Sequence, residues 1–314
     1  MRRATLAMIS VFAVAALGSA AARAQDLLHE ALSSFPADTV HLEVSSPASL
    51  RKLPDYSSLR THYLGPQLQQ LESSLRTLGI HESDIDTLAL GWTQTKRNSA
   101  MFGIAVGNFD TAAIEKSAQQ RAIAPDKVAG YPAYCLGAGL ETECALLLSD
   151  TEGAFGTLAT LNRMMDAKNG SAPNLASDEH FTSLVHKANT EAAIWGVAKG
   201  AAASEWLGTW MPSRQDVTLD WSQVLSSVNA ITYSIVPSSG DVKLAIRFMC
   251  ASSNDATSLR QVLTGLKLAQ QIAWQDQSPK IPNPFAATEI SADGSDVKLS
   301  LKSSFQALTA AGAP

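Results

Sequence analysis

The chain has 314 residues, of which 46% are hydrophobic, and a formal net charge of −5 at pH 7. This length is sufficient for about two domains of ~150 residues, each with a sizeable core. The acidic balance and the absence of a Lys/Arg cluster argue against a nucleic-acid-binding protein, because such proteins use clustered cations to displace the counterions of the phosphate backbone.

The N-terminus has the parts of an export signal peptide. Arg2 and Arg3 precede an uncharged run over residues 4–22, and Ala22-Arg23-Ala24 is a small-x-small cleavage site. Cleavage after Ala24 would leave 290 residues with a formal net charge of −8, because the segment carries three Arg and no acid. We therefore expect a periplasmic or secreted protein with no membrane span after cleavage. The run is also long enough to be an uncleaved anchor, which is the alternative.

The first half of the remaining chain is expected to contain hairpins, each followed by a helix. Hydrophobic spacing, turn residues and capping residues define these elements. The expected elements are a short amphipathic segment at 26–33, a strand at 40–45, a helical turn at 47–51, a helix at 65–78, strands at 85–92 and 101–106, a helix at 110–122, hairpin arms at 131–136 and 145–149, and a helix opened by Ser149-x-x-Glu152 with Phe155, Leu158, Leu161 and Met165 on one stripe.

The second half repeats this order after a stretch rich in Gly, Pro, Asn and Ser. The expected elements are a helix at 181–188, a strand at 192–200, a helix at 201–210, a hairpin and helix at 229–273, a last hairpin with its turn at 291–294, and a short helix from Ser303. The predicted divisions are a signal peptide at 1–24, a first half at 25–168, a linker at 169–178 and a second half at 179–314.

Residues 229–273 carry the clearest pattern in the chain. The strand at 241–250 alternates, with its apolar residues on one face and Lys243 and Arg247 on the other. Ser252 and Asp255 then form a capping-box arrangement at the start of a helix. Cys250 falls on the inward face, so we expect an inert buried thiol. Repetition of this unit predicts an α+β fold of two similar halves, with antiparallel sheets covered by helices on one face.

Cys135 and Cys144 lie on the two arms of one predicted hairpin, where their sulfur atoms could face each other. A disulfide between them is one interpretation. The other is a pair of small buried hydrophobic residues, because cross-strand geometry allows a disulfide only at some registers.

Trp206 and Trp210 are one helical turn apart in SEWLGTWMP and are the candidate patch for a ligand or partner. The occupant would be an unknown protein or a small apolar ligand. The alternative, which the spacing favours, is that both indoles form the core stripe of a helix on its sheet.

No motif nominates a catalytic, cofactor-binding or metal-binding residue, and we expect no cofactor. The six histidines lack the His-x-x-x-His spacing of a zinc helix, and no nucleophile elbow or phosphate-binding glycine loop occurs. Residues 81–86 gather one His and three acids, but a solvated loop explains them better than a metal site. Asp293-Gly294-Ser295-Asp296 is explained by a hairpin turn.

Residues 35–56, 78–92 and 101–116 resemble secreted bacterial proteins of uncharacterised function, which begin with a similar Phe-Pro-Ala-Asp-Thr phrase and strand. The resemblance implies export and supplies no activity or site residues. The leading hypothesis is an exported, non-catalytic binding or interaction protein of the bacterial cell envelope. The alternatives are an envelope structural factor held by an uncleaved N-terminus and a hydrolase of unrecognised type.

Overall fold

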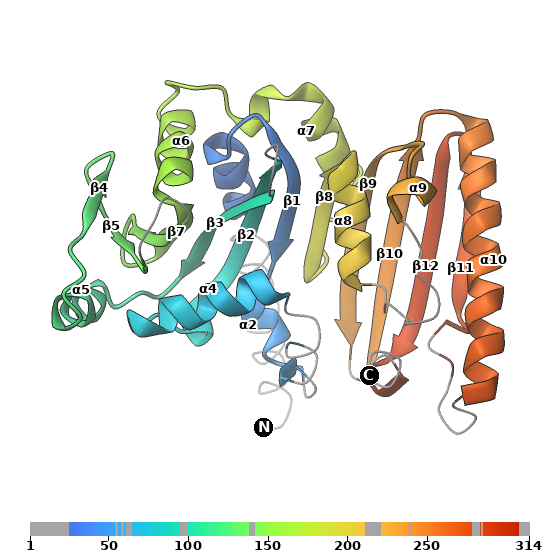
Figure 1. The fold of residues 1–314 in the computed structure, drawn as a ribbon, viewed down its shortest axis with the longest axis horizontal. Helices are drawn as coiled ribbons and strands as arrows, with labels where there is room; N and C mark the ends of the chain where they lie inside the picture. The colour runs from blue at the N-terminus through green and yellow to red at the C-terminus, as the bar shows by residue number, and fades with distance from the viewer. Residues whose placement is uncertain are drawn as a thin grey trace, which may run out of the picture.

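A computed structural model describes residues 25–53, 56–57, 60, 65–94, 99–137, 142–210, 221–238, 240–277, 283 and 285–307. The predicted signal peptide lies outside these residues. The described strands form a single antiparallel sheet in the order β11-β12-β10-β9-β8-β1-β2-β3-β7-β6-β5-β4 (Figure 1). The α+β class predicted from the sequence is confirmed.

The strands of the first half are β1 (Thr39–Ser45), β2 (Ile85–Gln94), β3 (Ser99–Gly107), β4 (Asp126–Val128), β5 (Tyr131–Cys135), β6 (Glu143–Leu147) and β7 (Glu152–Thr157). Those of the second half are β8 (Ile194–Lys199), β9 (Val228–Ser238), β10 (Asp241–Cys250), β11 (Thr288–Asp293) and β12 (Asp296–Ser304). Strands β1 and β8 pair with each other at the centre, so the sheet is continuous across the predicted boundary between the halves.

The two halves share one strand order, counted outward from that central pair. The first half runs β1-β2-β3-β7-β6 and the second runs β8-β9-β10-β12-β11, so the last strand of each half lies inside the strand that precedes it. The first half has an additional hairpin, β4–β5, at its edge. An internal duplication would give this order, and it stays a prediction.

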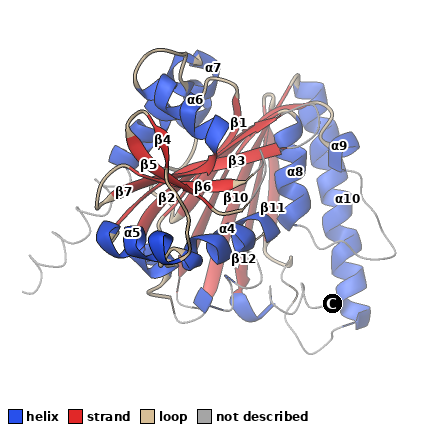
Figure 2. Cartoon of the chain, turned by 60° about the vertical axis from the view of Figure 1, so that its left-hand side comes forward, coloured by secondary structure: helices blue, strands red, loops and turns tan. Residues whose placement is uncertain are grey.

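Helices lie on both faces of the first half and of β8 and β9, whereas β10, β12 and β11 carry described helices on one face. A helix at 25–34, α6 (Leu158–Lys168) and α7 (Glu179–Val185) pack on one face. The opposite face carries α4 (Pro66–Thr77), α5 (Thr111–Gln120), α8 (Ala201–Trp210), α9 (Trp221–Val224) and α10 (Ser253–Gln277). The short α2 (Pro47–Leu50) contacts β2. Figure 2 shows α6 and α7 on the opposite side of the sheet from α4 and α5.

The predicted one-sided cover therefore describes β10, β12 and β11 in the described part of the chain, because α7 also contacts β8 and β9 on the other face. In the first half, Leu42 on β1 faces the α6 side and Leu90 on β2 faces the α4 side, and both are at most 1% exposed. In the second half, the inward residues of β10 face α10 as expected, including Phe248 at 1% and Cys250 at 6% exposure.

The segment Glu152–Thr157 is strand β7, whereas the sequence predicted the start of a helix there. The Ser149 hydroxyl accepts hydrogen bonds from the backbone N–H groups of Thr151 and Glu152, which closes a turn between strands and does not cap a helix. Thr157 is the true cap of α6 and accepts from Thr160 N. Gly153 and Gly156 lower the helix propensity of the segment, and pairing with β3 and β6 completes it as a strand.

Residues 169–178, the predicted linker, pack against the first half. Leu175 begins the 3-10 helix Leu175–Ser177, has 0% exposure, and its backbone N–H donates to Phe35 O at 2.7 Å. Asn174 forms an isolated bridge with Pro36. Residues 174 and 175 are therefore held against residues 35 and 36 of the first half.

The β4–β5 turn predicts a stabilising substitution. Ala129 and Gly130 have φ values of 50° and 91°, the left-handed pair of a type I′ turn, in which Asn-Gly is preferred. We expect Ala129→Asn to raise the free energy of unfolding by roughly 1 kcal/mol, because Asn tolerates this conformation better than Ala. Urea unfolding measures the change. As control, Ala112→Asn on exposed α5 should destabilise the protein by about 0.5 kcal/mol. Equal signs for the two variants would contradict the prediction.

Candidate functional site

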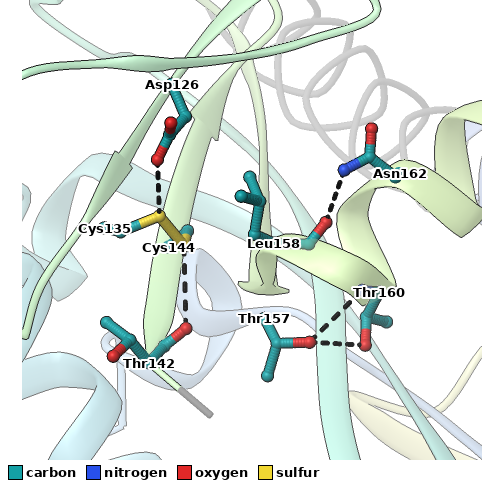
Figure 3. The surroundings of a disulfide bond; sticks show 8 residues. All are labelled: Asp126, Cys135, Thr142, Cys144, Thr157, Leu158, Thr160 and Asn162. Atoms are coloured by element: carbon teal, nitrogen blue, oxygen red, sulfur yellow. Dashed lines mark hydrogen bonds between the residues drawn. A yellow bond between two sulfur atoms is a disulfide. The ribbon is translucent and has the colours of Figure 1, made fainter. Parts of the chain in front are cut away.

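Cys135 and Cys144 form a disulfide with an S–S distance of 2.05 Å. The two residues are directly opposite each other on β5 and β6, so the first of the two sequence interpretations is confirmed. The bond lies beside the start of α6 (Figure 3). The third cysteine, Cys250, is a buried free thiol whose pKa is raised by burial, as expected for an unreactive residue.

A pocket with a volume of about 590 Å³ opens next to this disulfide. Its lining includes Thr77 at the end of α4, Arg121 after α5, and Asp126 and Cys135 on the β4–β5 hairpin. Arg121 and Asp126 are both exposed, so the charged groups of this pocket remain in contact with water. The pocket therefore lacks the buried ionisable groups that are typical of catalytic sites.

The candidate ligand patch on α8 is not an exposed patch at Trp206. The Trp206 side chain is 5% exposed, and its ring stacks on Tyr233 with the ring centroids 3.7 Å apart. The core interpretation of this indole is therefore correct. The side chain of Trp210 lies outside the described residues.

A buried polar cluster occupies the centre of the sheet, beneath α8. The Tyr233 hydroxyl donates to Glu43 Oε2 at 2.5 Å and lies 2.7 Å from His41 Nε2. With the hydroxyl proton directed at Glu43, a proton on His41 Nε2 completes the chain of hydrogen bonds. The His41 ring stacks on Trp92 with the centroids 4.2 Å apart, so β1, β2, β9 and α8 all contribute to this central cluster.

Gly196 on β8 allows the central cluster to form. Tyr233 is on β9 and its polar partners are on β1, so its ring must lie across the intervening strand. A Cβ at Gly196 would lie 2.4 Å from both Tyr233 Cζ and its hydroxyl oxygen, and 2.7 Å from Leu42 O. Only glycine fits at this position with the ring in place.

Burial sets the protonation states in the central cluster. Desolvation lowers the pKa of His41 to about 3, so its imidazole is neutral at physiological pH. Desolvation also raises the pKa of Glu43, an effect that hydrogen bonds from Tyr233 and Trp206 oppose. The pKa of Tyr233 lies well above 10 through burial and the nearby Glu43 carboxylate. His41 is only 6% exposed, and its hydrogen-bond and stacking partners lie within the cluster. The central cluster is therefore part of the packed core.

The residues of the central cluster had a partial signal in the sequence. Alternation places His41 and Glu43 on one face of β1 and Tyr233 on the inward face of β9. The pairing of β1 with β8 brings these positions together, and no local pattern specifies that pairing. Elsewhere in the described part of the chain, no three His, Cys, Asp or Glu side chains gather as metal ligands do.

The loop at residues 81–86 is held by protein partners. Glu82 accepts from Arg51 Nη1 at 2.9 Å and from the Tyr56 hydroxyl at 2.6 Å. Asp84 accepts from His81 N at 2.8 Å. Glu82 and Asp84 thus accept hydrogen bonds from neighbouring protein groups.

The candidate functional surface, which we call the open face, is the side of β10, β12 and β11 opposite α10, with Val236 near the end of β9. The Lys243, Lys298 and Lys302 side chains are exposed there, and Ala245 and Ser300 lie between them. Other members of the open face are Val236, Arg247, Glu289, Ser291, Asp293 and Asp296.

The open face contains like charges in direct register. Lys243 is opposite Lys302 and Arg247 is opposite Lys298 across the β10–β12 pair. Like charges at directly opposed positions destabilise a sheet. Acids at the margins offset this, with Lys302 3.5 Å from Asp241, Lys298 3.2 Å from Asp293 and Arg247 3.9 Å from Asp296. Because such exposed ion pairs each contribute at most about 1 kcal/mol, the basic side chains can exchange partners.

The fold defines the chain as an α+β protein built on one continuous antiparallel sheet, one face of which is covered by helices and the other only in part by the described residues. No protein-family model and no curated protein matches its sequence. Among solved structures it is similar to TP0453. Crystal form I of that protein aligns with a TM-score of 0.55 over 90% of this chain and 95% of TP0453, at 7% identity. Crystal form III gives 0.51 over 89% and 96%, at 8% identity. At this identity the likeness shows a shared fold alone.

Substitution of Gly196 tests the central cluster. We expect Gly196→Ala to lower the free energy of unfolding by about 2–4 kcal/mol, because the added methyl displaces the Tyr233 ring or the backbone of β1. In the Tyr233→Leu background the same substitution should cost less, since the aromatic ring is gone. A double-mutant cycle by urea unfolding measures this coupling. Additive effects of the two substitutions would contradict the proposed crossing of Tyr233 over Gly196.

The depressed pKa of His41 predicts a pH-dependent stability. Below pH 6.5 the unfolded state binds a proton at His41 that the folded state does not accept until about pH 3. The stability contribution of His41 is thus complete above pH 6.5 and falls as the pH decreases, by about 1.4 kcal/mol per pH unit at most. Wild type should lose stability relative to His41→Gln at this rate between pH 6 and pH 4.5 (roughly 2 kcal/mol in total). Parallel urea-unfolding curves across this range would rule the mechanism out.

Proposed function

We propose that this protein is an exported, non-catalytic binding protein of the bacterial cell envelope and that the open face binds a protein partner. The observation that carries the proposal is the exposed set of basic side chains in register on β10 and β12. Helices cover the opposite side of the same strands, so the backbone beneath the open face is held rigidly by a packed core. A rigid platform reduces the ordering cost of binding.

The shape and chemistry of the open face favour a protein over a small apolar ligand. Small-molecule sites are concave and mostly apolar, so that most of the ligand surface is buried. The open face instead follows the strands of a sheet, with long charged side chains around the small Ala245 and Ser300. Such a surface matches the polar rim and flat geometry of a protein–protein interface.

The partner is expected to present carboxylates to the centre of the open face. Lys243 and Lys302 repel each other, as do Arg247 and Lys298, and a carboxylate placed between the members of a pair would remove this repulsion. Complementary charge of this kind increases the association rate and selects the partner. The basic side chains thus occupy the centre of the open face, and the acids lie at its margins.

Export is supported by the N-terminal sequence and by the Cys135–Cys144 disulfide, because disulfides persist in the periplasm and outside the cell. None of the described helices is long and apolar enough to cross a membrane. The N-terminal segment itself lies outside the described residues, so its cleavage is part of the proposal. The second candidate is a structural factor held in the envelope by that segment.

Site-specific photocrosslinking in cells tests the open face. We expect a photoreactive amino acid at Ala245 to give one discrete crosslinked product, since this position lies between the two basic pairs. The same amino acid at exposed Ala113 on α5 is the matched control and should give no such product. In a Lys243→Glu/Lys302→Glu background the product should fall at least about tenfold, because the carboxylates of the partner would then be repelled.

Equal crosslinking from Ala245 and Ala113, or a product unaffected by charge reversal, would overturn the proposed binding surface. The intact mass of the protein recovered from the envelope separates the two candidates. The mass of a chain that begins at Gln25 supports the exported binding protein. Retention of residues 1–24 supports the anchored factor.

A further inference from the structure

Helix α10 has an apolar stripe on the side that faces away from the sheet. Its inward side carries Ala256, Leu259 and Leu263, which are at most 5% exposed. On the outward side, Val262 is 44% exposed, Leu268 54% and Ile272 64%. These three are the most exposed large apolar side chains in the described part of the chain. Figure 1 shows α10 at the end of the molecule, beside β11, where no other described element lies outside it.

Two small residues lie in line with Val262 and Ile272, and we call these four the outer stripe; Leu268 lies at its margin. Val262, Gly265, Ala269 and Ile272 are separated by three, four and three residues, which places them along one side of a helix. All four are exposed, and a Cβ at Gly265 would have nothing within 4 Å. Gly265 and Ala269 therefore form a shallow depression between two larger side chains, where the backbone of another helix could approach closely.

The outer stripe is its own complement when it is reversed. The order large, small, small, large is symmetric about the midpoint at residue 267. A second α10 that runs antiparallel across the first would place Val262 against Ile272 of its partner, and Gly265 against Ala269 of its partner. Each small residue would meet a small residue and each large one a large one. A two-fold interface requires this self-complementarity.

We propose that the outer stripe of α10 binds a second copy of this chain, forming an antiparallel helix pair about a two-fold axis near residue 267. The 3-4-3 spacing is that of paired helices that bury a shared seam. The stripe residues are uncharged, so no carboxylate or ammonium group is desolvated along the seam. The proposal is independent of the open face, which lies on the other side of the sheet and stays free in the dimer.

The neighbouring edge strand is a weaker candidate for this contact. Lys267 Nζ donates to the backbone carbonyl of Thr288 at 2.6 Å, and this residue begins β11. The lysine thus occupies one hydrogen-bond acceptor at the sheet edge, a device that disfavours strand addition. The helix stripe offers the larger apolar surface.

Sedimentation velocity of the mature protein tests the proposal. We expect the weight-average mass to rise from that of one chain toward that of two over a micromolar concentration series. Gly265→Glu should weaken the dimer at least about 100-fold, because it places two unpaired carboxylates in the close-approach region. The substitution replaces glycine with a better helix former in open space, so the monomer should stay folded. Thr264→Glu, one residue away and off the stripe, is the matched control and should leave the dimer unchanged.

Engineered cysteines test the antiparallel register. Chains that carry Gly265→Cys mixed with chains that carry Ala269→Cys should form an interchain disulfide under mild oxidation. Each variant alone should form it much less, because residues of one kind are offset along the antiparallel pair. Crosslinking that is strongest for each variant alone would overturn the antiparallel arrangement.

Three further results would overturn the proposed dimer. A wild-type protein that stays monomeric throughout, or equal weakening by Gly265→Glu and Thr264→Glu, overturns the proposal. Membrane binding would also overturn it. In that case the wild-type protein would be a monomer that sediments with vesicles of phosphatidylethanolamine and phosphatidylglycerol, and Gly265→Glu would not, because a lipid surface would then occupy the stripe.

Discussion

The antiparallel pairing of β1 with β8 is the constraint on which the rest of the molecule depends. It joins two strand arrays of the same order into one sheet, and it brings the polar residues of β1 within reach of Tyr233 on β9. Trp92 and Trp206 then stack on His41 and Tyr233, so β2 and α8 are fixed to the same central pair. The β1–β8 pairing, the missing side chain at Gly196 and the stacked aromatic rings therefore depend on one another at the junction of the halves.

The sequence predicted those parts of the fold that local patterns determine. Alternation in β10, the Ser252 cap of α10 and the Asp110 cap of α5 all appear as expected. The predicted disulfide is present, because hairpin register is also a local property. Strand β7 was not predicted, because the turn at Ser149 resembles a helix cap. The central cluster around Tyr233 was not predicted, because it depends on pairing between strands that are far apart in the sequence.

The strand sequences also record how each half is covered. In β3 and β6, apolar or small residues run almost without interruption, SAMFGIAVG and ECALL, as in strands that are buried on both sides. In β10 and β12, charged residues alternate with Val, Leu, Ile and Phe, as in strands with one wet face. The difference between the halves can therefore be inferred from these runs. It also explains why charged side chains line the open face of β10 and β12.

The burial of Cys250 has a consequence for oxidative folding. Three cysteines allow three different pairings in an oxidising compartment, and two of them involve Cys250. Cys135 and Cys144 are only nine residues apart, so they meet by closing a short hairpin, while either pairing with Cys250 requires a long loop to close. Once β10 docks beneath α10, the Cys250 thiol is shielded and its raised pKa disfavours the nucleophilic thiolate. Formation of the second-half core thereby shields Cys250 from exchange with the native disulfide.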